Sequence, residues 1–126
     1  LREEGATVLS DEVLVLHRQG EVFHAVGTPF WNGARGSAPV VALWGLGRGD
    51  AAVVPMRGGP AGVLRHLVRN LALPVRAPGL EAQALDAAAA LARHAAGFEL
   101  RYVPGQPIAS LVHHAVETAA RGTTQP

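Results

Sequence analysis

The spacing of hydrophobic positions changes along this chain and separates segments that favour strands from segments that favour helices. Short apolar runs rich in β-branched residues, bounded by Gly, Pro or Asp, are typical of strands. They predict strands at residues 6–9, 13–17, 21–26, 40–46, 51–55 and 98–103. Gln19-Gly20 supplies a hairpin turn, and His17 and His24 are candidate neighbours across the two strands. The run at 40–46 is apolar on both faces, so we expect it to be a central strand.

Apolar residues with a period of three to four predict helices in the second half of the chain. These helices run from Pro60 to about residue 71, from about residue 80 to 96, and onward from Pro107. Proline suits the first turn of a helix, and we expect Gly97 to close the second one. Residues 1–5 read as the last turn of a further helix that ends at a glycine. This order of elements predicts an α/β or α+β fold with a mixed sheet.

The domain organisation predicted from this pattern is simple. We expect one domain over residues 1–121 and a flexible tail at 122–126. Residues 27–39 form a long Gly- and Pro-rich loop, and loops of that length are often functional.

Composition narrows the classes of function. The formal net charge of the 126 residues is +1, so we expect no nucleic-acid partner. No apolar run reaches transmembrane length, and we expect a cytoplasmic protein with no membrane partner. The chain has neither cysteine nor lysine. It therefore has no thiolate metal site, and it does not contain the G-x-x-x-x-G-K-[ST] loop that binds nucleotide phosphates.

Candidate chemistry begins where the run at 6–9 ends in Ser10, Asp11 and Glu12. Carboxylates at the carboxyl edge of a buried α/β strand point into the crevice where ligands bind. Mg²⁺ prefers one or two carboxylates together with phosphate oxygens and water, so Asp11 and Glu12 are candidate metal ligands. A polar turn between two strands is the alternative. In the loop at 27–39, Arg35 can bind a cofactor phosphate bidentately or be an ordinary solvated arginine.

Three stretches resemble motifs of the HPr kinase-like family, in the same order and at about the same spacing. Gly5–Glu12 is similar to the family's strand that ends in Ser-Asp-Asp. Val26–Trp31 is similar to its Gly-Thr-Pro-aromatic turn, and Gly36–Trp44 to its Gly-Ser-Ala-Pro turn leading into a central strand. The likeness covers nearly the whole chain. It implies the mixed-sheet P-loop kinase fold of HPr serine kinase and ATP-dependent phosphoenolpyruvate carboxykinase, incomplete at the N-terminus.

The resemblance also implies a function. The P-loop and its helix would precede Leu1, and ATP and Mg²⁺ would be the cofactors of the complete protein. Asp11 would be catalytic, binding Mg²⁺ or steering a Ser or Thr hydroxyl of a protein or peptide substrate. Without the P-loop, the chain alone would be inactive. Homo-oligomer formation stays open.

The sequence differs from the family's motifs at two places, and two other functions also fit the same elements. Glu12 stands where the family usually has Asp, and residues 31–35 lack the acid that often follows the second motif. The same elements also suit a binding or scaffold module that has lost its chemistry. A ribonuclease-H-like nuclease is a further alternative, but it would need several carboxylates converging on two metal ions.

Overall fold

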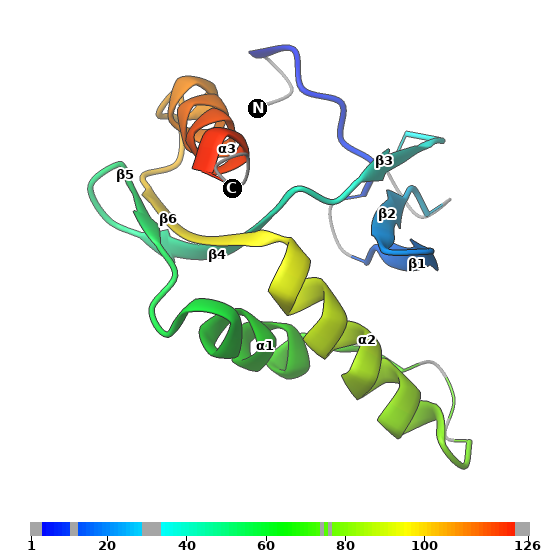
Figure 1. Cartoon of the computed structure of the whole chain (residues 1–126). Coiled ribbons are helices and arrows are strands. Elements are labelled where there is room, and N and C mark those ends of the chain that lie inside the picture. Colours follow the sequence, from blue (N-terminus) through cyan, green and yellow to red (C-terminus); the bar gives the residue numbers. More distant parts are fainter. Residues whose placement is uncertain (1–3, 11–12, 29–33, 74, 76, 123–126) are drawn as a thin grey trace. The chain divides into compact units, whose positions relative to one another are not determined.

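A computed structural model describes residues 4–10, 13–28, 34–73, 75 and 77–122, with residues 121 and 122 described as backbone. Over these residues the chain has a mixed α/β fold with six strands in two sheets and three helices (Figure 1). Contacts divide the chain into two compact units, Leu1–Val40 with Pro107–Ala109, and Val41–Gln106 with Ser110–Pro126. The prediction of one domain over residues 1–121 stays a prediction, and residues 123–126 of the expected tail lie outside the described residues.

The first unit is an antiparallel sheet of three strands in the order β1-β2-β3. Its strands are β1 (Val15–Gln19), β2 (Val22–Val26) and β3 (Ser37–Pro39). The turn at Gly20 has φ 64°, a left-handed conformation that glycine adopts without a steric penalty. His17 pairs with His24, so the predicted hairpin is confirmed, with its turn at Gly20-Glu21, one residue later than expected. Because Ser37–Pro39 pairs with β2, the expected loop at 27–39 ends earlier than predicted.

The strand predicted at residues 6–9 is wrong in this structure. Residues 6–9 belong to no sheet, and Ala6 and Thr7 are exposed. Among the described residues, one backbone hydrogen bond, from the Ala34 N–H to the Val8 carbonyl at 2.9 Å, joins this segment to the loop before β3. A single bond does not make a ladder, because a strand needs a partner that supplies donors and acceptors along its length.

The N-terminal end of the first unit is tied to residue 109. The Ala109 N–H donates to the Glu4 carboxylate at 3.1 Å, and this bond lowers the pKa of Glu4 below its usual value because it favours the charged form. Gly5 has φ 88°, a conformation typical of the glycine that follows a helix. Residues 1–3 lie outside the described residues, so the helix end expected at 1–5 stays a prediction.

The second unit contains a mixed sheet in the order β4-β6-β5. Its strands are β4 (Ala42–Arg48), β5 (Ala52–Pro55) and β6 (Ala96–Tyr102). β6 runs parallel to β4 and antiparallel to β5, so it is the central strand. The prediction that residues 40–46 form a central strand is therefore wrong. Within the described residues β4 pairs with β6 on one side only, and the side chain of Leu46 on β4 is 66% exposed.

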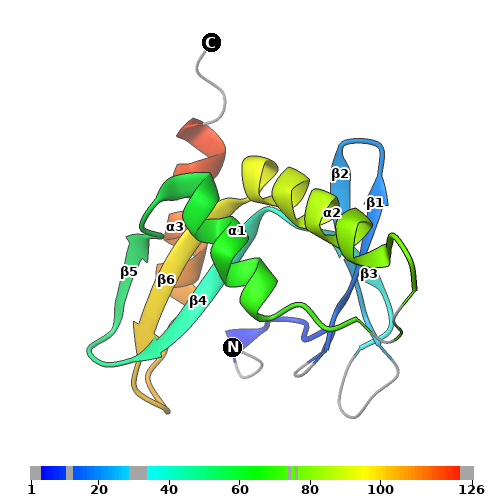
Figure 2. The same ribbon diagram turned by 90° about the horizontal axis from the view of Figure 1, so that it is seen from below.

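Three helices lie on the two faces of this sheet, as Figures 1 and 2 both show. α1 (Gly59–Arg69) and α2 (Leu80–His94) lie on one face, and α3 (Ala109–Gly122) lies on the other. All three were predicted from their periodicity, with ends that differ by one or two residues. None of the described helices combines the length and the hydropathy that crossing a membrane requires.

The core of this unit forms where α1 packs on the sheet. Met56, Val63 and Ala92 are buried together, with Leu43, Leu64 and Leu67 packed around them. On the opposite face, the rings of Trp44 and Phe98 stack with centroids 4.9 Å apart.

Gly97 belongs to β6 and does not close α2, contrary to prediction. The helix ends at His94, and Ala95 is already extended at φ −91° and ψ 136°. A Cβ on Gly97 would overlap the Val63 side chain on α1, so glycine permits the close approach of helix and strand.

We expect Gly97→Ala to destabilise the protein by roughly 1–3 kcal/mol, because the added methyl forces α1 away from β6. Gly45→Ala is the matched control, since a Cβ there would meet its nearest neighbours at an ordinary 3.5 Å. Urea unfolding followed by circular dichroism measures both variants. Equal midpoints for the two would contradict this account of the packing.

Candidate functional site

The site residues predicted from the sequence lie in the first unit. Asp11 and Glu12 lie outside the described residues, so their candidacy as catalytic and metal-binding groups stays a prediction. Arg35 is exposed at a bend before β3. Within the described part of the chain its guanidinium has no ion-pair partner, which fits either a phosphate contact or a solvated arginine.

Thr28 is a buried polar residue of the first unit. Its side chain is 7% exposed. Its hydroxyl donates to the Val13 carbonyl at 3.0 Å and lies 3.3 Å from the Ser10 hydroxyl oxygen. Ser10 and Val13 are the residues on either side of Asp11 and Glu12 in the sequence. Thr28 therefore holds both ends of the two-acid segment.

Backbone contacts complete this arrangement, which we call the Thr28 junction (Ser10, Val13, Gly27, Thr28 and Gly36). The Gly27 N–H donates to the Gly36 carbonyl at 2.9 Å. A Cβ on Gly27 would overlap the Ala34 carbonyl oxygen, so the close approach of the two segments requires glycine. The junction therefore joins three separate stretches of sequence: 8–13, 27–28 and 34–36.

Sequence reasoning assigned Thr28 to a turn and missed that it bridges segments. The available signal was the Gly-Thr pair: a glycine that permits close approach, followed by a hydroxyl that can both donate and accept hydrogen bonds. A single hydroxyl does not reveal which distant carbonyl it binds, because that depends on tertiary packing.

Among the residues that the structure describes, no three His, Cys, Asp or Glu side chains gather closely enough to bind a metal ion. Asp11 and Glu12 are not among these residues. His17 and His24 are neighbours across the hairpin, where they pair as backbone partners.

Comparison with known proteins gives no match: no protein-family model, no curated protein and no solved structure is similar to this chain.

We expect Thr28→Val to lower the free energy of unfolding by about 1–3 kcal/mol, because valine keeps the shape but leaves the Val13 carbonyl and the Ser10 hydroxyl short of a partner. Thr7→Val is the control, since Thr7 is exposed in the same segment. Urea unfolding of the purified chain measures both. A Thr28→Val midpoint equal to that of Thr7→Val would show that the junction bonds are not stabilising.

Proposed function

We propose that this chain is part of an ATP-dependent serine/threonine kinase of the HPr kinase-like family, acting on a hydroxyl of a protein or peptide. The observation that supports this most is the Thr28 junction. The three stretches that resemble family motifs are separate in the sequence, and residues from each of them meet there: Ser10 from the first, Gly27 and Thr28 from the second, and Gly36 from the third. Motifs that build one catalytic site are expected to converge in this way.

The side-chain oxygen atoms of residues 10–12 suit the Mg²⁺ that this proposal requires. Asp11 and Glu12 supply carboxylate oxygens and Ser10 a hydroxyl oxygen, and Mg²⁺ prefers such oxygen ligands. When bound, Mg²⁺ would neutralise charge on the phosphates of ATP. Asp11 would then orient the acceptor hydroxyl, and Arg35 would contact a phosphate.

Phosphoryl transfer depends mainly on positioning and on charge neutralisation. The anchoring of residues 10 and 13 would therefore help to position the two acids between them. An acid held at both flanking residues loses less conformational entropy when substrate binds than an acid on an untethered loop. Thr28 is thus a positioning residue in this proposal and takes no part in the chemistry.

A non-catalytic binding or scaffold module of the same fold is the second candidate. Two features favour it: the chain has no lysine with which to build a P-loop, and Glu12 replaces the second Asp of the family motif. Both candidates predict the same fold for these residues, so the difference lies in chemistry supplied from elsewhere in the protein.

The DNA that encodes the protein upstream of Leu1 tests the proposal. We expect it to encode G-x-x-x-x-G-K-[ST] after a strand pattern and before a helix pattern. A complete gene without that motif would contradict the kinase proposal and favour the binding or scaffold module.

A further inference from the structure

The second unit contains a hollow with a volume of about 410 Å³ between α1 and the sheet. It is built from β4, β6, α1 and the segment that leads into α1, all within one compact unit. A volume of this size suits a small-molecule ligand. None of the residues that line the hollow belongs to the Thr28 junction.

Arginine dominates the lining of this hollow. Of the eleven Lys and Arg residues in the sequence, all arginine, five line it. They are Arg48, Arg57, Arg65, Arg69 and Arg101. Glu99 is the carboxylate among the lining residues, whereas the whole chain carries a formal net charge of only +1. A cleft lined mostly by one sign of charge raises the local concentration of the opposite ion.

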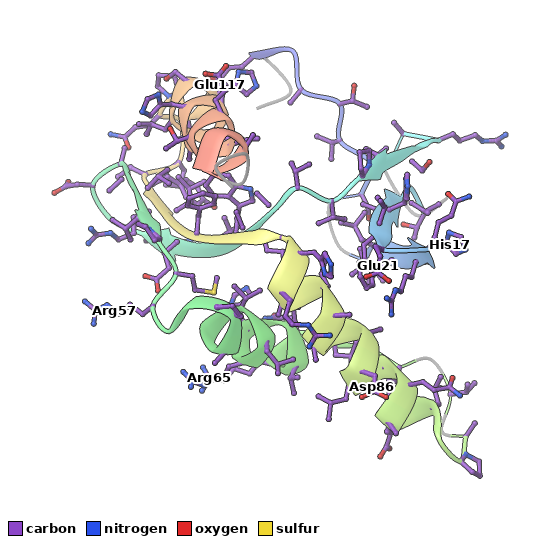
Figure 3. All side chains as sticks on the ribbon, in the orientation of Figure 1. His17, Glu21, Arg57, Arg65, Asp86 and Glu117 are labelled. Carbon is purple, nitrogen blue, oxygen red and sulfur yellow. The ribbon has the colours of Figure 1, made fainter. Side chains whose placement is uncertain are left out.

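These arginines come from different walls of the hollow. Arg65 and Arg69 are four residues apart on α1, so they share one face of the helix. Arg101 lies on β6, opposite Gly47 of β4 in the parallel pairing. Figure 3 labels Arg57 on the segment that leads into α1 and Arg65 on α1 itself, and both side chains extend outward from the ribbon. A ligand in the hollow would meet guanidinium groups from both the helix and the sheet.

Carboxylates among the described residues do not pair with these five arginines. Arg18 behaves differently, because its guanidinium pairs with Glu21 at 3.0 Å. Exposed cations without a counter-ion remain available to a mobile anion.

Glycines form the floor of the hollow, and packing does not explain them. Gly45 and Gly47 lie inside β4, where a glycine weakens the strand. A Cβ on Gly45 would meet the His66 and Met56 side chains at 3.5 Å, and one on Gly47 would meet Arg101 at 3.6 Å. Both are ordinary contacts, unlike the overlap at Gly97. Glycine inside a strand often marks a place where a ligand approaches the backbone closely.

We propose that this hollow binds a compact diphosphate group, either free or as part of a nucleotide. A diphosphate carries about three negative charges near neutral pH on a group small enough to contact both walls at once. Guanidinium forks match phosphate oxygens bidentately. The glycine floor leaves room for the ligand to approach the strand backbone closely. The site needs no metal ion and no P-loop, so it does not depend on the proposed kinase function.

Isothermal titration of the purified chain with pyrophosphate, in low salt with EDTA, tests this proposal. We expect saturable binding that weakens roughly tenfold in Arg65→Gln and again in Arg101→Gln, because each removes a charge-assisted contact. Arg93→Gln removes the same charge from an exposed arginine outside the hollow and should bind like the wild type. An equal loss in Arg93→Gln, or no saturable binding to the wild type, would overturn the proposal.

Two further arms separate a built site from general attraction of anions. Gly47→Ala fills part of the floor, so it should weaken pyrophosphate binding while leaving the thermal unfolding midpoint unchanged or higher. Citrate, a multivalent carboxylate, should bind more weakly than pyrophosphate, and equal affinity would overturn the assignment to phosphate. ADP compares the two sources: tighter binding than pyrophosphate assigns the site to nucleotides, and equal binding assigns it to the diphosphate group alone.

Discussion

Asp11→Asn in the protein made from the whole gene is expected to lower kinase turnover by roughly a hundredfold or more. Asparagine keeps the shape and much of the hydrogen bonding of the side chain, but it removes the charge that offsets phosphate-bound Mg²⁺. Steady-state kinetics at saturating Mg²⁺ measure the effect. Turnover close to that of the wild type, with an unchanged Mg²⁺ dependence, would return Asp11 to the role of a polar turn residue.

Glu12→Gln is the matched comparison, because it removes the same charge from the neighbouring residue. Its expected effect is smaller, since the longer side chain reaches past the position that the family's Asp occupies. Equal losses in the two variants would mean that the acids act as a pair and that the catalytic role does not belong to Asp11 in particular.

The 126-residue chain by itself is expected to show no ATP-dependent phosphate transfer. The P-loop backbone and its lysine hold the β- and γ-phosphates of ATP, and these residues include no lysine. Transfer of radiolabelled phosphate from ATP to serine and threonine peptides measures this, with a heat-treated sample as the control. Label incorporated above that control would contradict the expectation.

Local patterns predicted most of the elements because those elements depend on near neighbours. The hairpin from β1 to β2 follows from a two-residue turn, and α1 follows from Pro60 together with a regular apolar stripe. The stacked pair of Trp44 and Phe98 required the pairing of β4 with β6, which local sequence does not contain.

The errors have a common cause, which is that a run of apolar residues does not identify its partner. Residues 6–9 are apolar enough for a strand but form one backbone bond with residue 34 and no ladder. Residues 40–46 predict a central strand, yet β6 occupies the centre because it pairs on both edges. Gly97 reads as a helix cap, and its role is instead set by Val63, which is far from it in the sequence.

The candidate sites show the same limit. Sequence alone selected Asp11, Glu12 and Arg35 by residue type and position, but not the buried Thr28 that ties residues 10 and 13 together. The arginine-lined hollow was also out of reach, because Arg65 on α1 and Arg101 on β6 meet only after the sheet has formed. A cluster of side chains from several elements can be recognised only when the topology that brings those elements together is known.

Phosphate transfer by the protein made from the whole gene tests the central proposal most directly. The measurement follows label from the γ-phosphate of ATP into serine and threonine peptides, with Mg²⁺ and with EDTA, for the wild type and for Asp11→Asn. We predict Mg²⁺-dependent transfer by the wild type and little by the variant. The proposal would be contradicted if the wild-type protein bound no ATP and transferred no label under either condition.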